Sequence, residues 1–307
     1  MSDRSQTPIR PPRLAPGDTI GIVAPAGIVD RRQLRAGISQ LKKLGFELHV
    51  PDQVYFSNGY LAGSDRQRAD TINAAIGNPD VNAIICARGG YGCTRILDLI
   101  DYAAMRDNPK LIVGFSDVTA LLVAAYVRSG LVTIHGPVVT SLSTADHRTI
   151  VALDQILSGE QAVALTASDG LAICTGVGEG PVLAGNLTLL CHLIGTPFVP
   201  AFSGHILLLE DLGEARYRID RMLTHLALAG CFEGVAGIAL GTFKDCGSSE
   251  KLHALFHERF RKLGIPVVAG FDIGHARRNL PVPIGLRATL DAEQGILAYD
   301  SAATCES

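Results

Sequence analysis

The run Leu111-Ile-Val-Gly-Phe-Ser116-Asp-Val-Thr-Ala-Leu-Leu122 joins two sequence patterns. Its first five residues are apolar and partly β-branched, which is typical of a buried strand. Residues 118–127 are rich in Ala and Leu and long enough for about three helical turns. Ser116 lies where the strand gives way to the helix. A serine on such a sharp turn presents its Oγ above the strand ends, beside backbone N–H groups, as a nucleophile requires.

The same alternation of patterns extends to both sides of this turn. Strands are predicted at 19–24, 46–50, 82–87, 111–115 and 131–134, and helices at 31–44, 64–77, 94–106 and 118–129. Ser64 and Gln67 form a capping-box pattern at the start of one helix. Apolar strands that alternate with helices predict a parallel sheet covered on both faces. The order is expected to be flavodoxin-like or Rossmann-like, with ligands at the carboxyl ends of the strands.

The composition and the order of predicted elements change in the second half of the chain. A length of 307 residues favours two domains, and a segment rich in Gly, Ala, Ser and Thr that ends at Gly180 predicts a linker. We therefore expect a flavodoxin-like domain over 1–150, a linker over 151–180 and a β-rich α+β domain over 181–307. The elements predicted in the last domain are strands at 205–210, 234–240 and 267–270, a hairpin at 287–297, and helices at 186–194, 217–228 and 249–263.

The composition excludes several classes of protein. A net charge of −3 with scattered Lys and Arg argues against nucleic acid and against an anionic membrane surface as partners. The apolar runs are too short to span a membrane, and residues 1–18 lack the apolar segment of a signal peptide. Seven cysteines without a C-x-x-C pair predict reduced, mostly buried thiols and no zinc site. We expect a cytoplasmic protein.

A glycine-rich turn, Arg88-Gly-Gly-Tyr-Gly92, follows the third predicted strand. Paired glycines let backbone N–H groups approach a ligand, although a bare tight turn explains the pattern as well. The position of the turn, on the strand before that of Ser116, favours an oxyanion hole formed by the N–H groups of Gly90 and Asp117. No phosphate-binding glycine motif is complete here, so a nucleotide site is the less favoured interpretation.

A serine nucleophile also needs a base and an orienting acid. His135 ends the fifth predicted strand, and His275 lies in a loop rich in Gly, Pro and Asn; composition favours His275 only slightly. Glu210 closes an apolar strand and is well placed to accept an imidazole N–H. Asp211 or Glu214 is expected to cap the helix that follows.

Taken together, these segments resemble the LD-carboxypeptidase family, serine peptidases that trim murein peptides in the bacterial cytoplasm. The ordered set covers nearly the whole chain, although each piece alone is weak. It consists of Ile20-Gly-Ile-Val-Ala-Pro25, Arg88-Gly-Gly-Tyr-Gly92, Gly114-Phe-Ser-Asp117, His135-Gly-Pro137, Gly185-Asn-Leu187, Leu209-Glu-Asp211 with Glu214, Tyr217-x-x-Asp220-Arg221, and Gly274-His275 with Asn279 and Pro283-x-Gly285.

The resemblance implies a triad of Ser116 as nucleophile, His275 as base and then acid, and Glu210 as the residue that orients His275. It also implies release of D-alanine from a murein tetrapeptide, a homodimer, a site at the junction of the two domains, and neither a metal nor a cofactor. The free carboxylate of the substrate requires a cation, for which Arg88, Arg277 and Arg278 are candidates by location. Tyr91 and His135 are further candidates for contact with the substrate.

Two other functions compete with this one. The microcin-immunity branch of the same family cleaves peptidyl-nucleotides and commonly stacks the adenine on Trp. This chain has no Trp, although Tyr55, Tyr60 and Tyr91 could take that role. The second alternative is a non-catalytic flavodoxin-like protein that holds a nucleotide or flavin phosphate at Gly89-Gly90.

Overall fold

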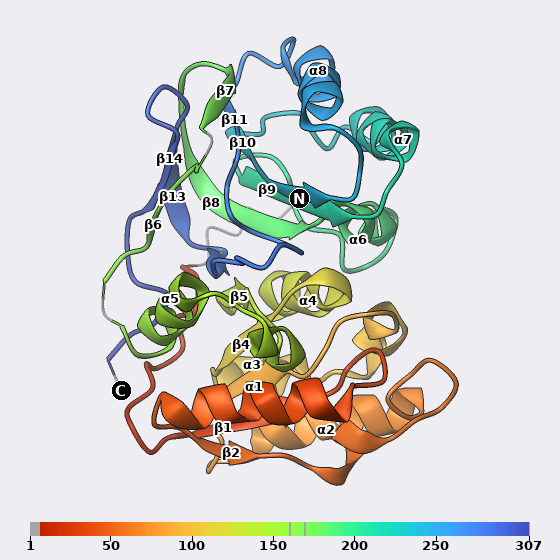
Figure 1. Cartoon of the computed structure of the whole chain (residues 1–307), viewed down its shortest axis with the longest axis vertical. Helices are drawn as coiled ribbons and strands as arrows, with labels where there is room; N and C mark the ends of the chain where they lie inside the picture. Colours follow the sequence, from red (N-terminus) through yellow and green to blue (C-terminus); the bar gives the residue numbers. More distant parts are fainter. Residues whose placement is uncertain (1–6, 160, 169, 307) are drawn as a thin grey trace.

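The computed structural model describes residues 7–159, 161–168 and 170–306. Residues 1–6, at the start of the segment in which no signal peptide is expected, lie outside this description. So do residues 160 and 169 of the expected linker. Two sheets lie one above the other along the long axis of the molecule, with α4 (Thr119–Ser129) and α5 (His147–Ser158) between them (Figure 1).

The first sheet confirms the flavodoxin-like fold. In spatial order its strands are β12 (Val282–Ile284), β5 (Thr133–His135), β4 (Leu111–Gly114), β3 (Ala83–Cys86), β1 (Thr19–Val23) and β2 (Glu47–His49). The five strands from the N-terminal half are parallel and follow the order 2-1-3-4-5, so the strand order reverses between β1 and β3. The sixth strand, β12, comes from the other half and pairs antiparallel with β5.

Helices α1 (Arg31–Lys43) and α2 (Asp65–Gly77) begin where the sequence supplies caps. The predicted capping box of α2 is confirmed, because Ser64 and Gln67 each accept a backbone N–H from the other. The predicted helix over 94–106 is instead a 3₁₀-helix, Cys93–Leu99, followed by α3 (Tyr102–Asp107). The side chain of Asp101 accepts the N–H of Ala104 and thereby starts a new helix.

The second sheet is mixed, which confirms a β-rich second domain. In spatial order its strands are β6 (Ala164–Thr166), β14 (Ile296–Tyr299), β13 (Arg287–Asp291), β8 (Val177–Asn186), β9 (Ile206–Leu212), β10 (Gly237–Lys244), β11 (Val267–Ala269) and β7 (Leu171–Cys174). Strands β8 to β11 are parallel to one another, and the outer pairs are antiparallel.

The expected linker over 151–180 contains much of this regular structure. Helix α5 continues to Ser158, and β6, β7 and the start of β8 lie within the segment. The glycines of β8 let the backbone of neighbouring loops approach the strand closely, and they do not mark a flexible linker. A Cβ at Gly178 would lie 2.1 Å from the carbonyl oxygen of Ala236. The same distance separates a Cβ at Gly180 from the carbonyl oxygen of Gly204.

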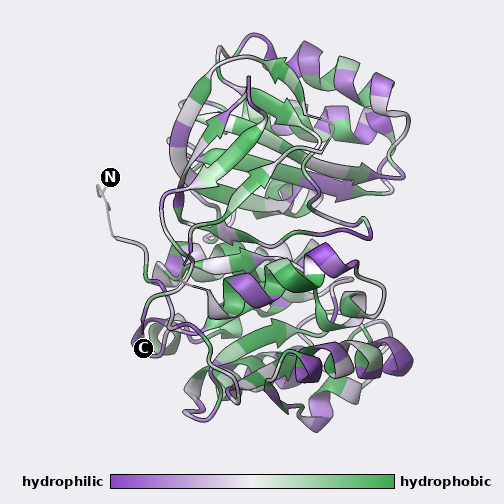
Figure 2. Cartoon of the chain, turned by 60° about the vertical axis from the view of Figure 1, so that its left-hand side comes forward, coloured by the Kyte–Doolittle hydropathy of each residue, from purple (hydrophilic) through white to green (hydrophobic). Residues whose placement is uncertain are grey.

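Three helices, α6 (Leu187–Leu193), α7 (Arg216–Leu228) and α8 (Ser249–Phe260), lie along one side of the second sheet. The strands of both sheets are largely hydrophobic, and hydrophilic residues are most frequent on helices and loops (Figure 2). All seven cysteines are free and most are buried, as predicted. In the described residues, no helix combines the length and apolar composition that a membrane span requires.

Candidate active site

Ser116 lies on a strained turn between β4 and α4. Its φ is +63°, a left-handed conformation that costs a residue with a side chain roughly 1–2 kcal/mol. The turn is tight because Gly114 has no side chain; a Cβ there would lie 2.5 Å from Val118 Cγ1. Backbone strain that the surrounding structure maintains is concentrated at functional sites. The geometry is that of a nucleophile elbow, in which Oγ stands above the strand ends.

The glycine-rich turn after β3 lies directly against this serine. A Cβ at Gly89 would be 2.9 Å from the Cβ and 3.1 Å from the Oγ of Ser116. Gly90 has a φ of +111°, which favours glycine. The N–H of Gly27 donates to the carbonyl of Gly89 at 3.1 Å, so the loop after β1 supports the turn. These contacts place the glycine-rich turn beside the turn of Ser116.

Two buried side chains that sequence reasoning did not interpret hold this turn in place. Asp117 Oδ2 accepts the N–H of Cys93 at 2.8 Å and ties the residue after Ser116 to the end of the turn. Arg68, fully buried on α2, donates from Nη1 to the carbonyls of Pro25 and Gly92. Arg68 also pairs with Asp65. No local pattern marks Arg68, because its two acceptors are backbone carbonyls distant in sequence.

His275 and Glu210 form a direct pair near the carboxyl end of β9, an interior strand of the second sheet. His275 Nδ1 lies 2.7 Å from Glu210 Oε2, with the carboxylate fully buried and the imidazole 12% exposed. Burial raises the pKa of Glu210, and the hydrogen bond from His275 opposes that rise. A carboxylate on Nδ1 fixes the imidazole tautomer and leaves Nε2 free to act as a base.

The loop before β12 gives His275 its orientation. Gly274 has a φ of +115°, and a Cβ there would lie 2.5 Å from Glu210 Oε2, so only glycine fits. The side chain of Asn279 accepts the N–H of Gly274 at 2.9 Å, and the N–H of Asn279 donates to Thr149 Oγ1 at 3.1 Å. The loop is thereby tied to α5 between the two sheets.

The phenyl ring of Phe115 brings the two halves of the site together. It lies against His275, with ring centroids 4.8 Å apart and an angle of 57° between the planes. Since Phe115 directly precedes Ser116, this contact places the imidazole beside the turn of Ser116. Ser116 lies in the turn after β4, His275 in the loop after β11, and Glu210 in β9.

His135 lies behind this contact and not in the open site. It is fully buried, its ring is 6.1 Å from that of Phe115, and neither ring nitrogen has a hydrogen-bond partner among the described residues. Burial, together with the nearby His275, lowers the pKa of His135 to about 3. The imidazole is therefore neutral at physiological pH.

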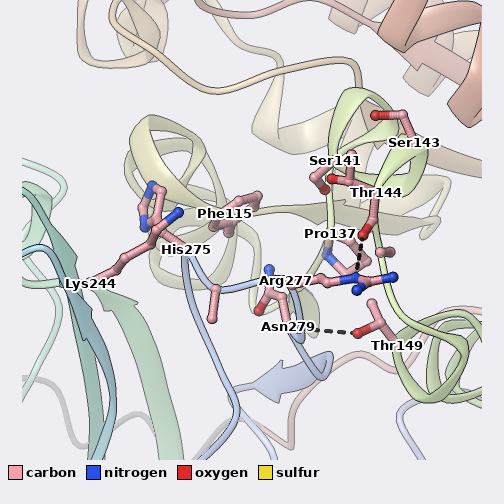
Figure 3. Close-up of a pocket in the computed structure, with 12 residues that line it drawn as sticks. Phe115, Pro137, Ser141, Ser143, Thr144, Thr149, Lys244, His275, Arg277 and Asn279 are labelled. Atoms are coloured by element: carbon pink, nitrogen blue, oxygen red, sulfur yellow. Dashed lines mark hydrogen bonds between the residues drawn. The ribbon is translucent and has the colours of Figure 1, made fainter.

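A cavity of about 620 Å³ opens beside His275. Its lining residues are Phe115, Pro137, Ser141, Ser143, Thr144, Ala145, Thr149, Lys244, His275, Ala276, Arg277 and Asn279. Arg277 donates from Nε to the carbonyl of Thr144 at 3.2 Å, which positions its guanidinium over the cavity (Figure 3). The side chain of Lys244, which sequence reasoning missed, points to the part of the cavity where His275 lies. No local signal in the sequence distinguishes Lys244 from other lysines.

The other sequence-predicted residues lie elsewhere. Arg278 is held by Asp146 at 2.7 Å and Asp272 at 2.9 Å, so its guanidinium joins loop segments. Asp211 accepts from the side chain of Asn186 and the N–H of Thr188. The expected cap of α7 by Asp211 or Glu214 is wrong, because the cap residue is Ala215, which supplies no side-chain acceptor.

Arg88 and Tyr91 line a second cavity, on the side of the glycine-rich turn where the loop after β1 lies. As for metals, no three His, Cys, Asp or Glu side chains in the part of the chain that the structure describes cluster as ligands would.

Family models place this arrangement among known proteins. Residues 20–136 match the LD-carboxypeptidase N-terminal domain, and residues 179–290 match the LD-carboxypeptidase C-terminal domain. A Streptomyces coelicolor protein, whose name assigns it provisionally to the carboxypeptidases, is 42% identical over 97% of this chain and 98% of its own. The murein tetrapeptide carboxypeptidase of Pseudomonas aeruginosa is 33% identical over 90% of this chain and 94% of its own.

Comparison with solved structures leads to the same family. The microcin C7 self-immunity protein MccF, which has also been solved with aspartyl sulfamoyl adenosine, superposes with a TM-score of 0.89. It is 27% identical, over 97% of this chain and 100% of that one. Muramoyltetrapeptide carboxypeptidase from Oxalobacter formigenes superposes with a TM-score of 0.81 at 33% identity, over 92% and 98%. This chain belongs to the LD-carboxypeptidase family.

Proposed function

We propose that this protein is a serine LD-carboxypeptidase that hydrolyses the L,D amide bond of murein tetrapeptides and releases the terminal D-alanine, in cell-wall recycling. The observation that carries the proposal is the bond between His275 and buried Glu210, next to the turn of Ser116. A buried carboxylate, an imidazole and a strained serine turn at one place are the parts of a hydrolytic triad. The similarity to a murein tetrapeptide carboxypeptidase supports the choice of substrate.

In this mechanism Ser116 Oγ attacks the scissile carbonyl while His275 Nε2 takes its proton. Glu210 keeps the proton on Nδ1 and stabilises the imidazolium that forms. The N–H groups of Gly90 and Asp117 donate to the oxyanion of the tetrahedral intermediate. His275 then protonates the leaving amine of D-alanine. Water, activated by the same histidine, releases the acyl group from Ser116.

The cavity beside His275 suits the leaving residue. Its volume of about 620 Å³ exceeds what D-alanine needs, but it carries two cationic side chains, Arg277 and Lys244. A carboxypeptidase must bind the free carboxylate of its substrate close to the group that protonates the leaving amine. Charge-assisted hydrogen bonds from Arg277 and Lys244 meet that requirement. We assign the terminal carboxylate to these two residues and not to Arg278, which is engaged with Asp146 and Asp272.

The second candidate is cleavage of peptidyl-nucleotides. The similarity to MccF, solved with aspartyl sulfamoyl adenosine, favours it. The absence of tryptophan from the sequence favours the murein substrate, since a nucleobase would have to stack on tyrosine instead. Incubation with an L,D-tetrapeptide and with an aminoacyl sulfamoyl adenosine separates the two. Turnover of only the adenosine compound would overturn the murein assignment.

The decisive test is replacement of the nucleophile. We expect Ser116→Ala to lower kcat for D-alanine release by about 10⁶-fold while circular dichroism and melting temperature stay close to wild type. Ser158→Ala is the matched control, because Ser158 ends α5 and donates only to the carbonyl of Asp154. Persistent activity in Ser116→Ala would refute the triad.

Two further properties belong to this proposal. We propose a cytoplasmic location, since the substrate of recycling is imported murein peptide, and a homodimeric state. Light scattering on the purified protein measures the second: a mass close to twice 32.4 kDa is expected, and a mass of one chain would refute the dimer.

A further inference from the structure

A third cavity, of about 360 Å³, adjoins the cavity beside His275. Lys244 and Ala276 line both cavities, so the two spaces are neighbours next to the proposed base. The other lining residues of the third cavity come from the second half of β10, the segment that follows it, α8 and the end of β11. Ligands of parallel sheets bind at the carboxyl ends of the strands, which is where this cavity lies.

The lining of the third cavity is mainly apolar. Leu252 and Phe256 contribute to it from α8 and are otherwise packed into the core. The ring of Phe256 lies against that of Phe243, another lining residue, with centroids 4.9 Å apart and planes at 54°. Among the described residues that line the cavity there is no carboxylate, and the only Lys or Arg is Lys244. An apolar cavity with a cation at its boundary suits an apolar group that is attached next to a carboxylate.

The strand ends below this cavity are fixed to the loop that carries His275. The N–H and the Oγ1 of Thr242 both donate to the carbonyl of Ile273, at 2.8 and 2.9 Å. Gly241 permits this approach, because a Cβ there would lie 2.5 Å from the same carbonyl oxygen. The third cavity is therefore held in place relative to the proposed base, and such preorganisation lowers the cost of binding a ligand.

The orientation of the leaving residue follows from the proposed function, on which this inference rests. Its amine lies at His275, which protonates it, and its carboxylate lies at Lys244 and Arg277. The side chain branches from the same Cα, about 1.5 Å from the carboxyl carbon. The first atom of that side chain therefore lies at the boundary between the two cavities. The methyl group of D-alanine ends there, whereas a longer side chain continues into the third cavity.

We propose that the third cavity is a specificity site for a large apolar side chain on the leaving D-residue. Lys244 binds the carboxylate at the boundary, and Leu252, Phe243 and Phe256 contact the side chain. The substrates of the enzyme then include L,D-peptides that end in D-leucine or another bulky apolar D-residue. The reaction is unchanged: water hydrolyses the same amide bond, and the free D-amino acid leaves.

The test compares three L,D-peptides that have the same acyl part and end in D-alanine, D-leucine or D-asparagine. The side chains of leucine and asparagine are similar in size and branching, but only that of leucine is apolar. For the wild type we expect kcat/KM to be about 10- to 100-fold higher for the D-leucine peptide than for the D-asparagine peptide, the range expected from burial of one apolar side chain.

Two variants fill the cavity from different elements. His253→Trp enlarges a half-buried lining residue of α8, and Ala269→Leu enlarges one of β11. Each is expected to lower the ratio of kcat/KM for D-leucine to kcat/KM for D-alanine about 10-fold, and this ratio does not depend on the fraction of enzyme that is folded. The matched control is His257→Trp, one turn further along α8 at an exposed position outside the cavity, which should retain the wild-type ratio.

The possible results separate this inference from the proposed function. If the wild type does not prefer D-leucine to D-asparagine, or if either filled variant retains the wild-type ratio, the specificity site is refuted while D-alanine release leaves the proposed function intact. An equal fall of the ratio in His257→Trp would also refute the site. If none of the peptides is hydrolysed, the proposed function fails, and titration of the D-leucine and D-asparagine peptides into Ser116→Ala tests the cavity by the ratio of Kd values. Cleavage of an aminoacyl sulfamoyl adenosine that both filled variants abolish, without a preference for D-leucine, would overturn the inference in favour of a nucleobase.

Discussion

The two halves of the site hold their reactive groups in different ways. In the N-terminal half the backbone does the positioning: Ser116 occupies a left-handed turn, and Gly89 lies against it with no side chain between them. In the C-terminal half a side chain positions the reactive group, since Oε2 of buried Glu210 lies 2.7 Å from Nδ1 of His275. The first half should therefore be sensitive to an added Cβ, whereas the second should be sensitive to a lost charge and also to a Cβ that displaces the charged pair.

The largest effect is expected from the charge. Glu210→Gln keeps the shape of the side chain but removes the carboxylate that, in the proposed mechanism, stabilises the imidazolium of His275. We expect kcat for D-alanine release to fall by about 10⁴-fold, with a small change in KM. Glu179→Gln, on the exposed part of β8, is the control and should retain wild-type kcat. A Glu210→Gln variant with more than a tenth of wild-type kcat would contradict the side-chain half of the comparison.

The second prediction places an added Cβ in the half that depends on a side chain. In Gly274→Ala the new Cβ would lie 2.5 Å from Glu210 Oε2 and displace the pair, so we expect kcat to fall about 100-fold. Gly247→Ala is matched in backbone conformation, with φ of +123° against +115°, but its Cβ meets open space. Both variants should lower the melting temperature through backbone strain. Equal loss of kcat in the two would show that strain alone is responsible.

The third prediction places a Cβ in the backbone half. Gly89→Ala brings no positive-φ strain, but its Cβ would lie 2.9 Å from Ser116 Cβ, so the serine must shift. We expect a fall in kcat of about ten-fold, smaller than at Gly274 because the displacement is smaller. Gly77→Ala, at the end of α2 with nothing within 4 Å, is the control. An unchanged kcat in Gly89→Ala would mean that the turn adapts freely.

The smallest effect concerns stability at the junction of the halves. The pKa of His135 is about 3 in the native protein, whereas an unfolded histidine has a pKa near 6.5. Between these two pKa values, the unfolded chain therefore binds a proton at His135 that the native chain does not bind. The contribution of His135 to stability is full above pH 6.5 and declines as the pH falls towards 3, by up to about 1.4 kcal/mol per pH unit.

Urea unfolding between pH 6 and pH 5 measures this decline. We expect the free energy of unfolding of the wild type to fall by about 1 kcal/mol more than that of His135→Leu over this interval. Burial raises the pKa of Glu210, which makes the free energy of unfolding increase as the pH falls. This contribution is present in both proteins and cancels in the difference between them. Parallel curves for the two proteins would show that His135 takes up its proton in the native state.

The N-terminal half was the more predictable from sequence, because its functional groups lie at the ends of apolar strands that periodicity reveals. Ser116 and Gly89-Gly90 follow β4 and β3 directly, so local pattern and parallel-sheet geometry suffice to bring them together. The weak point was the helix over 94–106, where one side-chain cap at Asp101 divides the segment.

The C-terminal half depends on contacts that no local pattern encodes. His275 was only slightly favoured over His135 by composition, and the resemblance to a family was needed to select it. The start of β8, up to Gly180, was interpreted as linker, since its glycines are required by carbonyls of neighbouring loops that are distant in sequence. Lys244 follows a register shift in β10, and such shifts leave little trace in sequence.

Strand β12 also sets the order in which the protein can be completed during synthesis. It closes the free edge of β5, yet it is made after nearly the whole of the second sheet, and the chain passes from it directly to β13. Until the ribosome has delivered Ile284, β5 presents an unpaired edge of the kind that invites aggregation. The loop that carries His275 lies immediately before this strand. In the proposed mechanism, catalytic competence is thus acquired late in synthesis, and a truncated N-terminal half is expected to be both inactive and prone to aggregate.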